Sequence, residues 1–167
     1  MQPAYIGLGS NLADPRARVE SALQALERLP RTQLVQRSRL YRSAPWGRGG
    51  QPDFVNAAAV LRTGLAPREL LAALLTIERA EGRQRGGERW GPRVLDLDIL
   101  VYADRVIDEP GLHVPHPHLH ERAFVLAPLA EMAPDLEIPG RGRVDALLAE
   151  IDASGCKVLE PGGDPPQ

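Results

Sequence analysis

Two aspartates separated by a single residue are the most informative chemical feature of this sequence. Asp96 and Asp98 fall within the apolar segment 94–102, which we expect to form a strand. Successive side chains of a strand point to opposite faces, so both carboxylates share one face, with Cα atoms roughly 6 to 7 Å apart. Two carboxylates so placed can hold hard cations. Mg²⁺ is the expected ion, because it takes few carboxylates and completes its shell with water and phosphate oxygens.

An arginine-rich segment comes directly before this strand. Its Gly86-Gly87 pair favours a loop, and Glu88 is its one acidic residue between positions 83 and 93. Guanidinium groups form planar forks that bind phosphate, and a glycine-containing loop lets them close over a polyphosphate. Metal-binding carboxylates beside phosphate-binding arginines are typical of enzymes that transfer phosphoryl groups. The alternative to a metal and phosphate site is that the two aspartates lie on a solvated strand face and that the arginines belong to a flexible, solvated loop. The arginines are Arg83, Arg85, Arg89 and Arg93.

All histidines of the chain fall within residues 113–120, beginning with His113. Prolines at 115 and 117 favour an extended segment, in which His116, His118 and His120 lie on one side. Three imidazoles on one side could bind zinc. The run contains neither a cysteine nor a carboxylate that would complete a zinc site, which weakens the zinc interpretation.

A glycine-containing turn, Gly7-Leu8-Gly9-Ser10-Asn11, follows the first expected strand. Position 12 is a leucine, so the third glycine of a dinucleotide-binding fingerprint is missing. No Gly-Lys-Ser or Gly-Lys-Thr follows, so a P-loop is excluded as well. A close approach of another group to the backbone explains these glycines better.

Hydrophobic spacing and turn residues predict the elements that must position these groups. Asp14-Pro15 and Pro67 mark the starts of two helices, which Pro30 and Gly82 end. The expected helices cover 15–29, 67–81, 121–132 and 144–151. The expected strands cover 4–9, 34–43, 54–61 and 94–102, and the last has a hairpin partner at 105–107.

Periodicity also predicts which side chains are buried. The strand 94–102 should bury one face behind the aspartates, formed by Leu95, Leu97, Ile99 and Val101. The second helix should bury Leu70, Leu71, Leu74 and Leu75. The element order β, α, β, β, α, β predicts an α+β fold of the ferredoxin-like kind, a mainly antiparallel sheet with helices packed on it.

Composition and charge narrow the class of protein. The chain has 167 residues, 43% of them hydrophobic and 25% charged, as in one globular domain, which we expect to span 1–159. The Pro- and Gly-rich residues 160–167 should form a disordered tail. A net charge of -2 argues against a general nucleic-acid binder.

The expected compartment is the cytoplasm. Cys156 is the single cysteine, so an intramolecular disulfide cannot form. We find neither a signal peptide nor a run of about 18 apolar residues that could cross a bilayer. We therefore expect no membrane or nucleic-acid partner, and a monomer or a dimer.

Beyond these motifs, the sequence resembles the hydroxymethyldihydropterin pyrophosphokinase family. Residues 89–100, Arg-Trp-Gly-Pro-Arg-Val-Leu-Asp-Leu-Asp-Ile-Leu, match the family signature at each constrained position. The resemblance covers most of the chain and includes Ala4-Tyr5-Ile6, Gly9-Ser10-Asn11-Leu12, Gln51-Pro52-Asp53-Phe54, Asn56-Ala57-Ala58, Val114-Pro115-His116 and Pro128-Leu129. It implies an ATP-dependent transfer of pyrophosphate to 6-hydroxymethyl-7,8-dihydropterin, which gives AMP and the pterin diphosphate in folate biosynthesis.

The resemblance also implies roles at the ATP phosphates. Asp96 and Asp98 would hold two Mg²⁺ ions that bridge the phosphates and the pterin hydroxymethyl oxygen. Arg83 and Arg93 would neutralise the charge that develops on the transferred group. No general base is assigned. The residues that the resemblance places around the nucleotide are Glu78, Arg85, Trp90, His116 and Arg122.

At the pterin, the resemblance implies an aromatic sandwich and polar contacts at the ring edge. Phe54 would stack on one face of the ring, and Trp90 or Phe124 on the other. The Asn56 amide would bind the polar rim, as would backbone groups of the segment that contains Ser43, Pro45 and Trp46. Gly7–Asn11 would approach the ligand from below.

Two positions depart from the relatives, and two other functions stay open. Leu75 stands where a relative has glutamine near the nucleotide, and Pro117 replaces a tyrosine, so those two contacts are in doubt. A metal-dependent phosphohydrolase or nucleotidyltransferase could use the same aspartates and arginines. A ferredoxin-like RNA-binding module is the non-enzymatic alternative.

Overall fold

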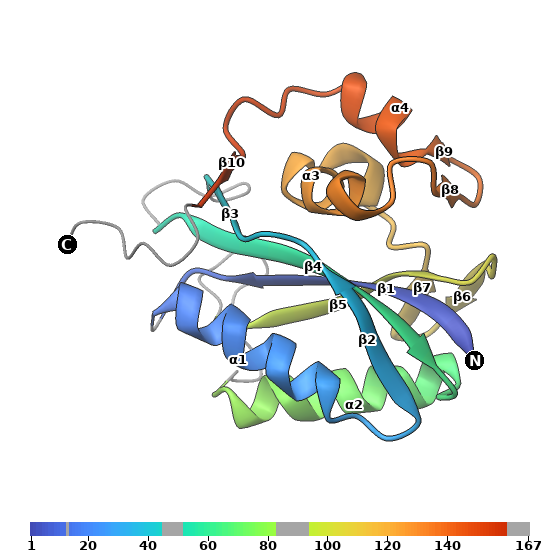
Figure 1. Ribbon diagram of the computed structural model, residues 1–167. Coiled ribbons are helices and arrows are strands. Elements are labelled where there is room, and N and C mark those ends of the chain that lie inside the picture. The colour runs from blue at the N-terminus through green and yellow to red at the C-terminus, as the bar shows by residue number, and fades with distance from the viewer. Residues whose placement is uncertain (13, 45–51, 83–93, 160–167) are drawn as a thin grey trace.

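In the computed structural model, which describes residues 1–12, 14–44, 52–82 and 94–159, two long strands lie at the centre of a sheet (Figure 1). β1 (Gln2–Ser10) and β4 (Phe54–Thr63) pair antiparallel, from Gln2 opposite Thr63 to Ser10 opposite Val55. β5 (Asp96–Tyr102) pairs antiparallel with the other edge of β1. The chain thus brings the two aspartates beside the glycines of the first strand.

The outer edge of β4 is covered by two short strands that follow each other in sequence. β2 (Thr32–Arg37) pairs with the end of β4, and β3 (Tyr41–Ser43) pairs with its start. β10 (Lys157–Val158) then pairs with β3. If β2 and β3 are counted as one interrupted strand, the order across the sheet and the βαββαβ sequence confirm the ferredoxin-like α+β fold.

One serine explains why the strand expected over 34–43 is two strands. The backbone N–H of Ser38 donates to Ala58 O (2.9 Å), while the Ser38 hydroxyl accepts from Ala58 N (2.9 Å) and donates to Arg39 O. The Ser38 side chain therefore replaces a backbone carbonyl in the ladder. Regular pairing stops there and resumes at Tyr41.

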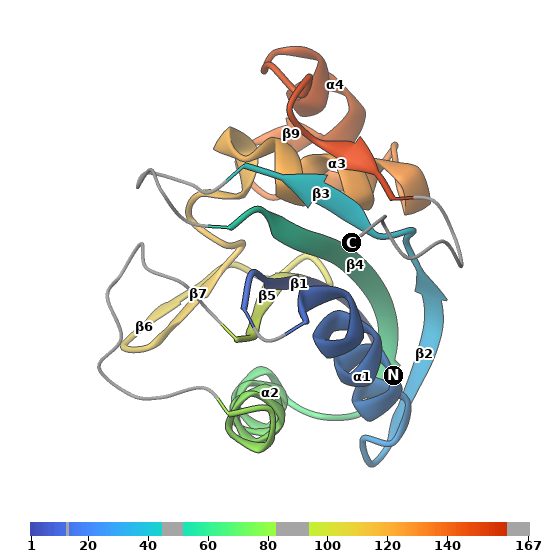
Figure 2. The same ribbon diagram turned by 90° about the vertical axis from the view of Figure 1, so that its left-hand side faces the viewer.

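Two helices cover one face of the sheet (Figures 1 and 2). α1 (Pro15–Glu27) begins as predicted, since the Asp14 carboxylate accepts the N–H of Ala17. α2 (Pro67–Ala80) ends before Gly82, whose φ of 94° suits glycine. Both helices pack their buried side chains against the alternating apolar residues of β1, β4 and β5.

A second helical layer covers part of the opposite face (Figure 1). It contains α3 (Ala123–Met132) and α4 (Val144–Ala149), whose apolar side chains form a separate cluster with Leu100 and Val101. A 3₁₀ turn (Leu119–Glu121), β8 (Glu137–Ile138) and β9 (Gly142–Arg143) lie beside this layer. The hairpin of β6 (Ile107–Glu109) and β7 (Leu112–Val114) instead contributes its buried residues to the core beneath α1 and α2.

Three local predictions are wrong. Residues 105–107 do not form a hairpin partner of β5; β6 pairs with β7 instead. Val101 does not share a face with Leu97 and Ile99, because the β1–β5 register shifts between Tyr5 and Ile6 and turns Leu100 and Val101 together to the α3 side. Leu75 is 37% exposed, since Ile77 and Glu78 continue the buried side of α2 in its place.

Candidate active site

Several expected site residues lie in register across one end of the sheet, on the side of α3. In register, Asp96 lies opposite Gly9, Gly9 opposite Asn56, and Asn56 opposite Tyr41. A second row places Asp98 opposite Gly7. Directly opposed side chains of antiparallel strands point to the same face, so the two half-buried carboxylates share a face with the Asn56 amide.

Glycines form the floor between the carboxylates and the amide. A Cβ atom at Gly9 would lie 2.9 Å from Asn56 Nδ2 and 3.8 Å from Phe54 Cδ1. At Gly7 it would lie 3.1 Å from a methyl group of Leu100. Because neighbouring strands are about 4.8 Å apart, the Cα atoms of Asp96 and Asn56 are separated by roughly 10 Å. Asn56 Nδ2 and the Leu100 side chain already fill the space that a Cβ would take at these two glycines, so only glycine permits this packing.

The Asn56 amide is held in one orientation by a neighbouring strand. The Ser43 hydroxyl on β3 donates to Asn56 Oδ1 at 2.6 Å, and both residues are buried. The Nδ2 group is consequently the one that faces Gly9. Phe54 lies opposite Ser43 in the ladder and is half-buried. The structure thus brings together Ser43, Phe54 and Asn56, as the sequence predicts; the hydrogen bond between Ser43 and Asn56 was not predicted.

His116 and Arg122 gather near Asp96 from the segment between β7 and α3. The His116 N–H donates to Leu100 O (2.9 Å) on the outer edge of β5. The His118 N–H donates to His116 Nδ1 (3.2 Å), so a neutral His116 ring carries its proton on Nε2. Burial first, and then the positive charge of Arg122, lowers the pKa of His116 to about 4 against the opposing effect of Asp96.

Phe124 opens α3 beside this cluster. The guanidinium carbon of Arg122 lies 5.6 Å from the centre of the Phe124 ring, a cation–π contact on one ring face. Leu75 and Pro117, the two departures from the relatives, are both exposed. The roles proposed for these positions from the resemblance stay predictions.

Glu78 has an unexpected environment. A glutamate near the end of a surface helix is usually solvated, yet Glu78 is only 2% exposed, and its Oε2 accepts the N–H of Leu97 at 2.7 Å. The burial of Glu78 could have been predicted from the sequence, since Glu78 continues the buried row of Leu70 and Leu74 at a spacing of four. Direct nucleotide binding by Glu78 stays a prediction.

The remaining expected residues lie outside the described ranges. They are Pro45, Trp46, Arg83, Arg85, Arg89, Trp90 and Arg93. The roles that the sequence suggests for them stay predictions.

The zinc alternative for the histidine run finds no support among residues 1–12, 14–44, 52–82 and 94–159. No group of three His, Cys, Asp or Glu side chains there could hold a metal ion. His113 instead pairs with Asp108 at 2.8 Å, and His118 and His120 lie 3.8 and 3.4 Å from Glu121. None of the helices in the same ranges has the length and apolar character that a membrane span needs.

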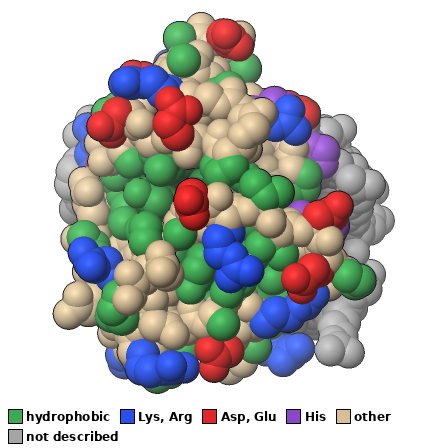
Figure 3. Space-filling view, turned by 90° about the vertical axis from the view of Figure 1, so that its right-hand side faces the viewer, with side chains coloured by type: hydrophobic (Ala, Val, Ile, Leu, Met, Phe, Trp, Pro, Cys, Tyr) green, Lys and Arg blue, Asp and Glu red, His purple; other side chains and the backbone are tan. Residues whose placement is uncertain are grey.

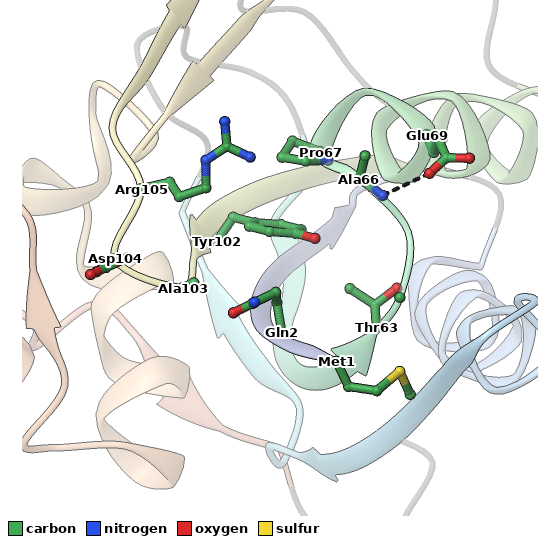
Figure 4. A pocket seen from close by; sticks show the side chains of 11 residues that line it. Met1, Gln2, Thr63, Ala66, Pro67, Glu69, Tyr102, Ala103, Asp104 and Arg105 are labelled. Atoms are coloured by element: carbon green, nitrogen blue, oxygen red, sulfur yellow. Dashed lines mark hydrogen bonds between the residues drawn. The ribbon is translucent and has the colours of Figure 1, made fainter.

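A hollow of about 420 Å³ lies at the other end of the sheet. Its lining comes from the start of β1, the end of β4, the start of α2 and residues 102–105 (Figure 4). Glu69 accepts the N–H of Ala66 (2.8 Å), and the Tyr102 hydroxyl donates to Leu65 O, so these polar groups serve the fold. Acidic and basic side chains are interspersed over this side of the molecule (Figure 3). The hollow is remote from the aspartates.

Fold and surface together define an α+β protein of ferredoxin-like topology whose conspicuous polar groups gather at one end of the sheet. A model of the family "7,8-dihydro-6-hydroxymethylpterin-pyrophosphokinase (HPPK)" matches residues 5–134. The chain therefore belongs to the HPPK family.

Curated relatives support the same assignment over nearly the full chain. A 2-amino-4-hydroxy-6-hydroxymethyldihydropteridine pyrophosphokinase of Pseudomonas aeruginosa is 52% identical over 159 residues, covering 95% of this chain and 98% of the relative. Enzymes of the same name from Methylorubrum extorquens and Bacillus subtilis are 46% and 40% identical, over 96% and 93% of this chain and 100% and 89% of the relatives.

Solved structures agree on the fold. An HPPK-DHPS solved in complex with substrates gives a TM-score of 0.74 at 13% identity, covering 95% of this chain and 46% of the other. Wild-type Plasmodium falciparum HPPK-DHPS with pteroate gives 0.71 at 14% identity, covering 89% and 42%. The present chain spans less than half of each of these longer chains.

Proposed function

We propose that this chain transfers a pyrophosphoryl group from ATP to 6-hydroxymethyl-7,8-dihydropterin as a step of folate biosynthesis. The hydroxymethyl oxygen bonds to the β-phosphorus, the bond from that phosphorus to the oxygen shared with the α-phosphate breaks, and AMP leaves. The hydroxyl proton is lost in the same reaction. Family membership supports this reaction. The structural observation that carries it is the glycine floor with two carboxylates on one side and an oriented amide on the other.

On the pterin side of the floor, the described residues supply one aromatic face and a fixed donor. Phe54 is half-buried beside Asn56, and the Ser43 hydroxyl holds Asn56 so that Nδ2 faces the floor. A flat heteroaromatic ring with a polar rim requires such a combination. Trp90 or Phe124 would complete the sandwich, and backbone groups near Pro45 and Trp46 would bind the ring edge.

On the phosphate side, His116 and Arg122 have different tasks. A neutral His116 donates one hydrogen bond through Nε2, because Nδ1 already accepts from the His118 N–H. Arg122 supplies permanent positive charge. The nucleotide contacts of Glu78, Arg85 and Trp90, and charge neutralisation by Arg83 and Arg93, complete the proposal.

The donor set of Asp96 and Asp98 fits Mg²⁺. Both side chains are half-buried on one face, and the residues opposite them, Gly9 and Gly7, have no side chain that could compete for the carboxylates. When bound, Mg²⁺ would offset phosphate charge and make the pterin hydroxyl more acidic. We propose two ions at this pair.

Product analysis tests the reaction. After mixing with Mg-ATP and 6-hydroxymethyl-7,8-dihydropterin, AMP and pterin diphosphate should appear in equal amounts. Asp98→Asn should lower the rate at least about a hundredfold with an unchanged circular dichroism spectrum. Near-normal turnover of that variant would contradict the metal assignment.

The same experiment separates the other two candidate functions. ADP or inorganic phosphate as the product would favour a phosphohydrolase, and pyrophosphate release would favour a nucleotidyltransferase. Binding of single-stranded RNA without ATP turnover would favour the RNA-binding module. A cytoplasmic location and a monomer or dimer stay predictions beside the proposed reaction.

A further inference from the structure

A buried carboxylate lies behind the strand that carries the two aspartates. Glu78 is 2% exposed, and its Oε2 lies 2.7 Å from the backbone nitrogen of Leu97, the residue between Asp96 and Asp98. Carboxylates are rarely buried to this extent unless a partner compensates the lost hydration. A charge-assisted hydrogen bond to a backbone N–H provides part of that compensation.

The geometry of the sheet edge explains why Leu97 requires a partner there. Among residues 1–12, 14–44, 52–82 and 94–159, β5 is the last strand on its side of the sheet, and no strand from these ranges pairs with its outer edge. Successive N–H groups of a strand point to opposite edges. Those of Asp96 and Asp98 are directed toward β1, whereas that of Leu97 is directed outward. Glu78 thus accepts the outward N–H of Leu97, as a carbonyl group of a neighbouring strand would.

The same edge has a second attachment three residues later. The His116 N–H donates to Leu100 O at 2.9 Å. The N-terminal part of β5 is therefore held by β1 on one side and by Glu78 and His116 on the other. The attachment at Leu97 lies between the two aspartates, at the start of this strand.

We propose that Glu78 is a positioning residue that fixes the direction of both aspartates through the peptide group of Leu97. Holding the N–H of the intervening residue fixes the backbone on both sides of it, and with it the Cα–Cβ directions of Asp96 and Asp98. Small displacements of reacting groups lower rates steeply, by up to about a hundredfold per ångström. This inference rests on the proposed function, since it concerns the geometry of the proposed Mg²⁺ site.

Three substitutions at Glu78 separate its possible roles. Glu78→Ala removes the acceptor, and we expect kcat to fall at least about tenfold while KM for the pterin stays within about threefold. Glu78→Gln retains an acceptor oxygen of the same reach and should recover most of the lost kcat. Glu78→Asp retains the charge on a shorter side chain, and its kcat should lie between those of Glu78→Ala and Glu78→Gln.

The matched control is Glu69→Ala on the same helix. Glu69 also accepts a backbone N–H, that of Ala66 at 2.8 Å, but at the opposite end of α2. Its loss should destabilise the fold without changing kcat. If Glu69→Ala and Glu78→Ala lower kcat alike at equal fractions of folded protein, or if Glu78→Gln is as inactive as Glu78→Ala, the proposal is wrong.

Two measurements need no turnover. Amide hydrogen exchange should show the Leu97 N–H losing at least about tenfold protection in Glu78→Ala relative to Leu95. Mn²⁺ binding, followed by electron paramagnetic resonance with a non-hydrolysable ATP analogue, should weaken severalfold in this variant only. Unchanged Leu97 exchange would overturn the proposal even in a variant of low activity. Wild-type protein that makes no pterin diphosphate would instead overturn the proposed function, while the exchange result still tests the attachment.

Discussion

The absence of a Cβ atom at Gly9 shapes the candidate site. Its position between Asp96 and Asn56 means that any side chain would rise from the floor of the candidate site. The nearest atom to an added Cβ would be Asn56 Nδ2, at 2.9 Å, which is the group that Ser43 turns toward the floor. The shape of the site and the orientation of its amide therefore depend on the same residue.

Gly9→Ala should weaken pterin binding about tenfold or more without unfolding the protein. The new methyl group must displace the Asn56 amide, and loss of one oriented hydrogen bond in a buried site accounts for that factor. Isothermal titration calorimetry in the presence of a non-hydrolysable ATP analogue measures it. Gly64→Ala is the control, because its Cβ would meet Arg31 Cβ at an ordinary 3.5 Å. Equal pterin affinity in Gly9→Ala and wild type would contradict the assignment of the floor.

His116 should stay neutral over the physiological range of pH. Burial and the charge of Arg122 lower its pKa to about 4 in the absence of ligands, so the imidazolium forms only under acidic conditions. The hydrogen bond from His118 leaves the proton on Nε2. In ¹⁵N-labelled protein, long-range imidazole spectra should report the Nε2–H tautomer from pH 6 to 8 and titration below pH 5. A midpoint near 6.5, or the Nδ1–H tautomer, would refute this interpretation.

At the scale of elements, Ser38 replaces a strand residue with a side-chain hydrogen bond. Its hydroxyl accepts the Ala58 N–H, which is otherwise buried at the junction of β2 and β3. Ser38→Ala should lower the free energy of unfolding by about 1 to 3 kcal/mol, the cost of a buried backbone donor without an acceptor. Thermal and urea denaturation measure this change.

Thr76→Ala is the matched control for this prediction. The Thr76 hydroxyl is exposed and donates to the carbonyl of Ala72 one turn earlier, so its removal leaves no buried donor. Alanine is also the better helix former. Stability changes of similar size in the two variants would mean that the Ser38 side chain does not substitute for the ladder.

Elements with local signals could be predicted from the sequence. Alternation, helical spacing and the helix-end residues Asp14, Pro67 and Gly82 predict β1, α1, β4, α2 and β5. The shared face of Asp96 and Asp98 follows from strand geometry alone. Features set by distant parts of the chain could not be predicted in this way. The pairing of β6 with β7 depends on competition between partners, and the register shift opposite Tyr5 reverses which face Val101 occupies.

In the candidate site too, features with a local signal could be predicted from the sequence, and tertiary contacts could not. Residue types and the family signature indicated the carboxylates, Phe54, Asn56 and His116, because their chemistry can be read from side chains. The attachment of Glu78 to Leu97 and the orientation of Asn56 by Ser43 are tertiary hydrogen bonds across 19 and 13 positions. No local pattern specifies such partners.

At the scale of the whole molecule, Glu131 joins the α3 layer to the sheet beneath it. Its carboxylate accepts from the Tyr41 hydroxyl (2.6 Å), the Arg39 N–H (3.0 Å) and Arg39 Nε (3.2 Å). Burial together with the Glu131 contact raises the pKa of Tyr41 to about 12. Because Tyr41 and Ser43 belong to β3 and Phe124 to α3, this contact relates two walls of the candidate site.

The stabilisation by Glu131 should depend on acidic pH. Burial raises the pKa of Glu131, but the hydrogen bonds from Tyr41 and Arg39 outweigh it, so the folded pKa lies below the ordinary 4.5. The contribution is therefore complete above about pH 5 and is lost as the pH falls through the folded pKa. Glu131→Gln should lower the Tm by roughly 2 to 6 °C at pH 7, with a difference that shrinks toward pH 3.

The pH dependence distinguishes an ionised contact from simple packing. Glu150→Gln, an exposed change at the C-cap of α4, should leave Tm within about 1 °C at both pH values. Tyr41→Phe combined with Glu131→Gln should cost less than the sum of the single changes, since each removes the same hydrogen bond. A Tm difference between Glu131→Gln and wild type that is constant from pH 7 to pH 3 would show that the carboxylate charge plays no part. The contact between α3 and β3 would then rest on hydrogen bonds that do not need an ionised Glu131.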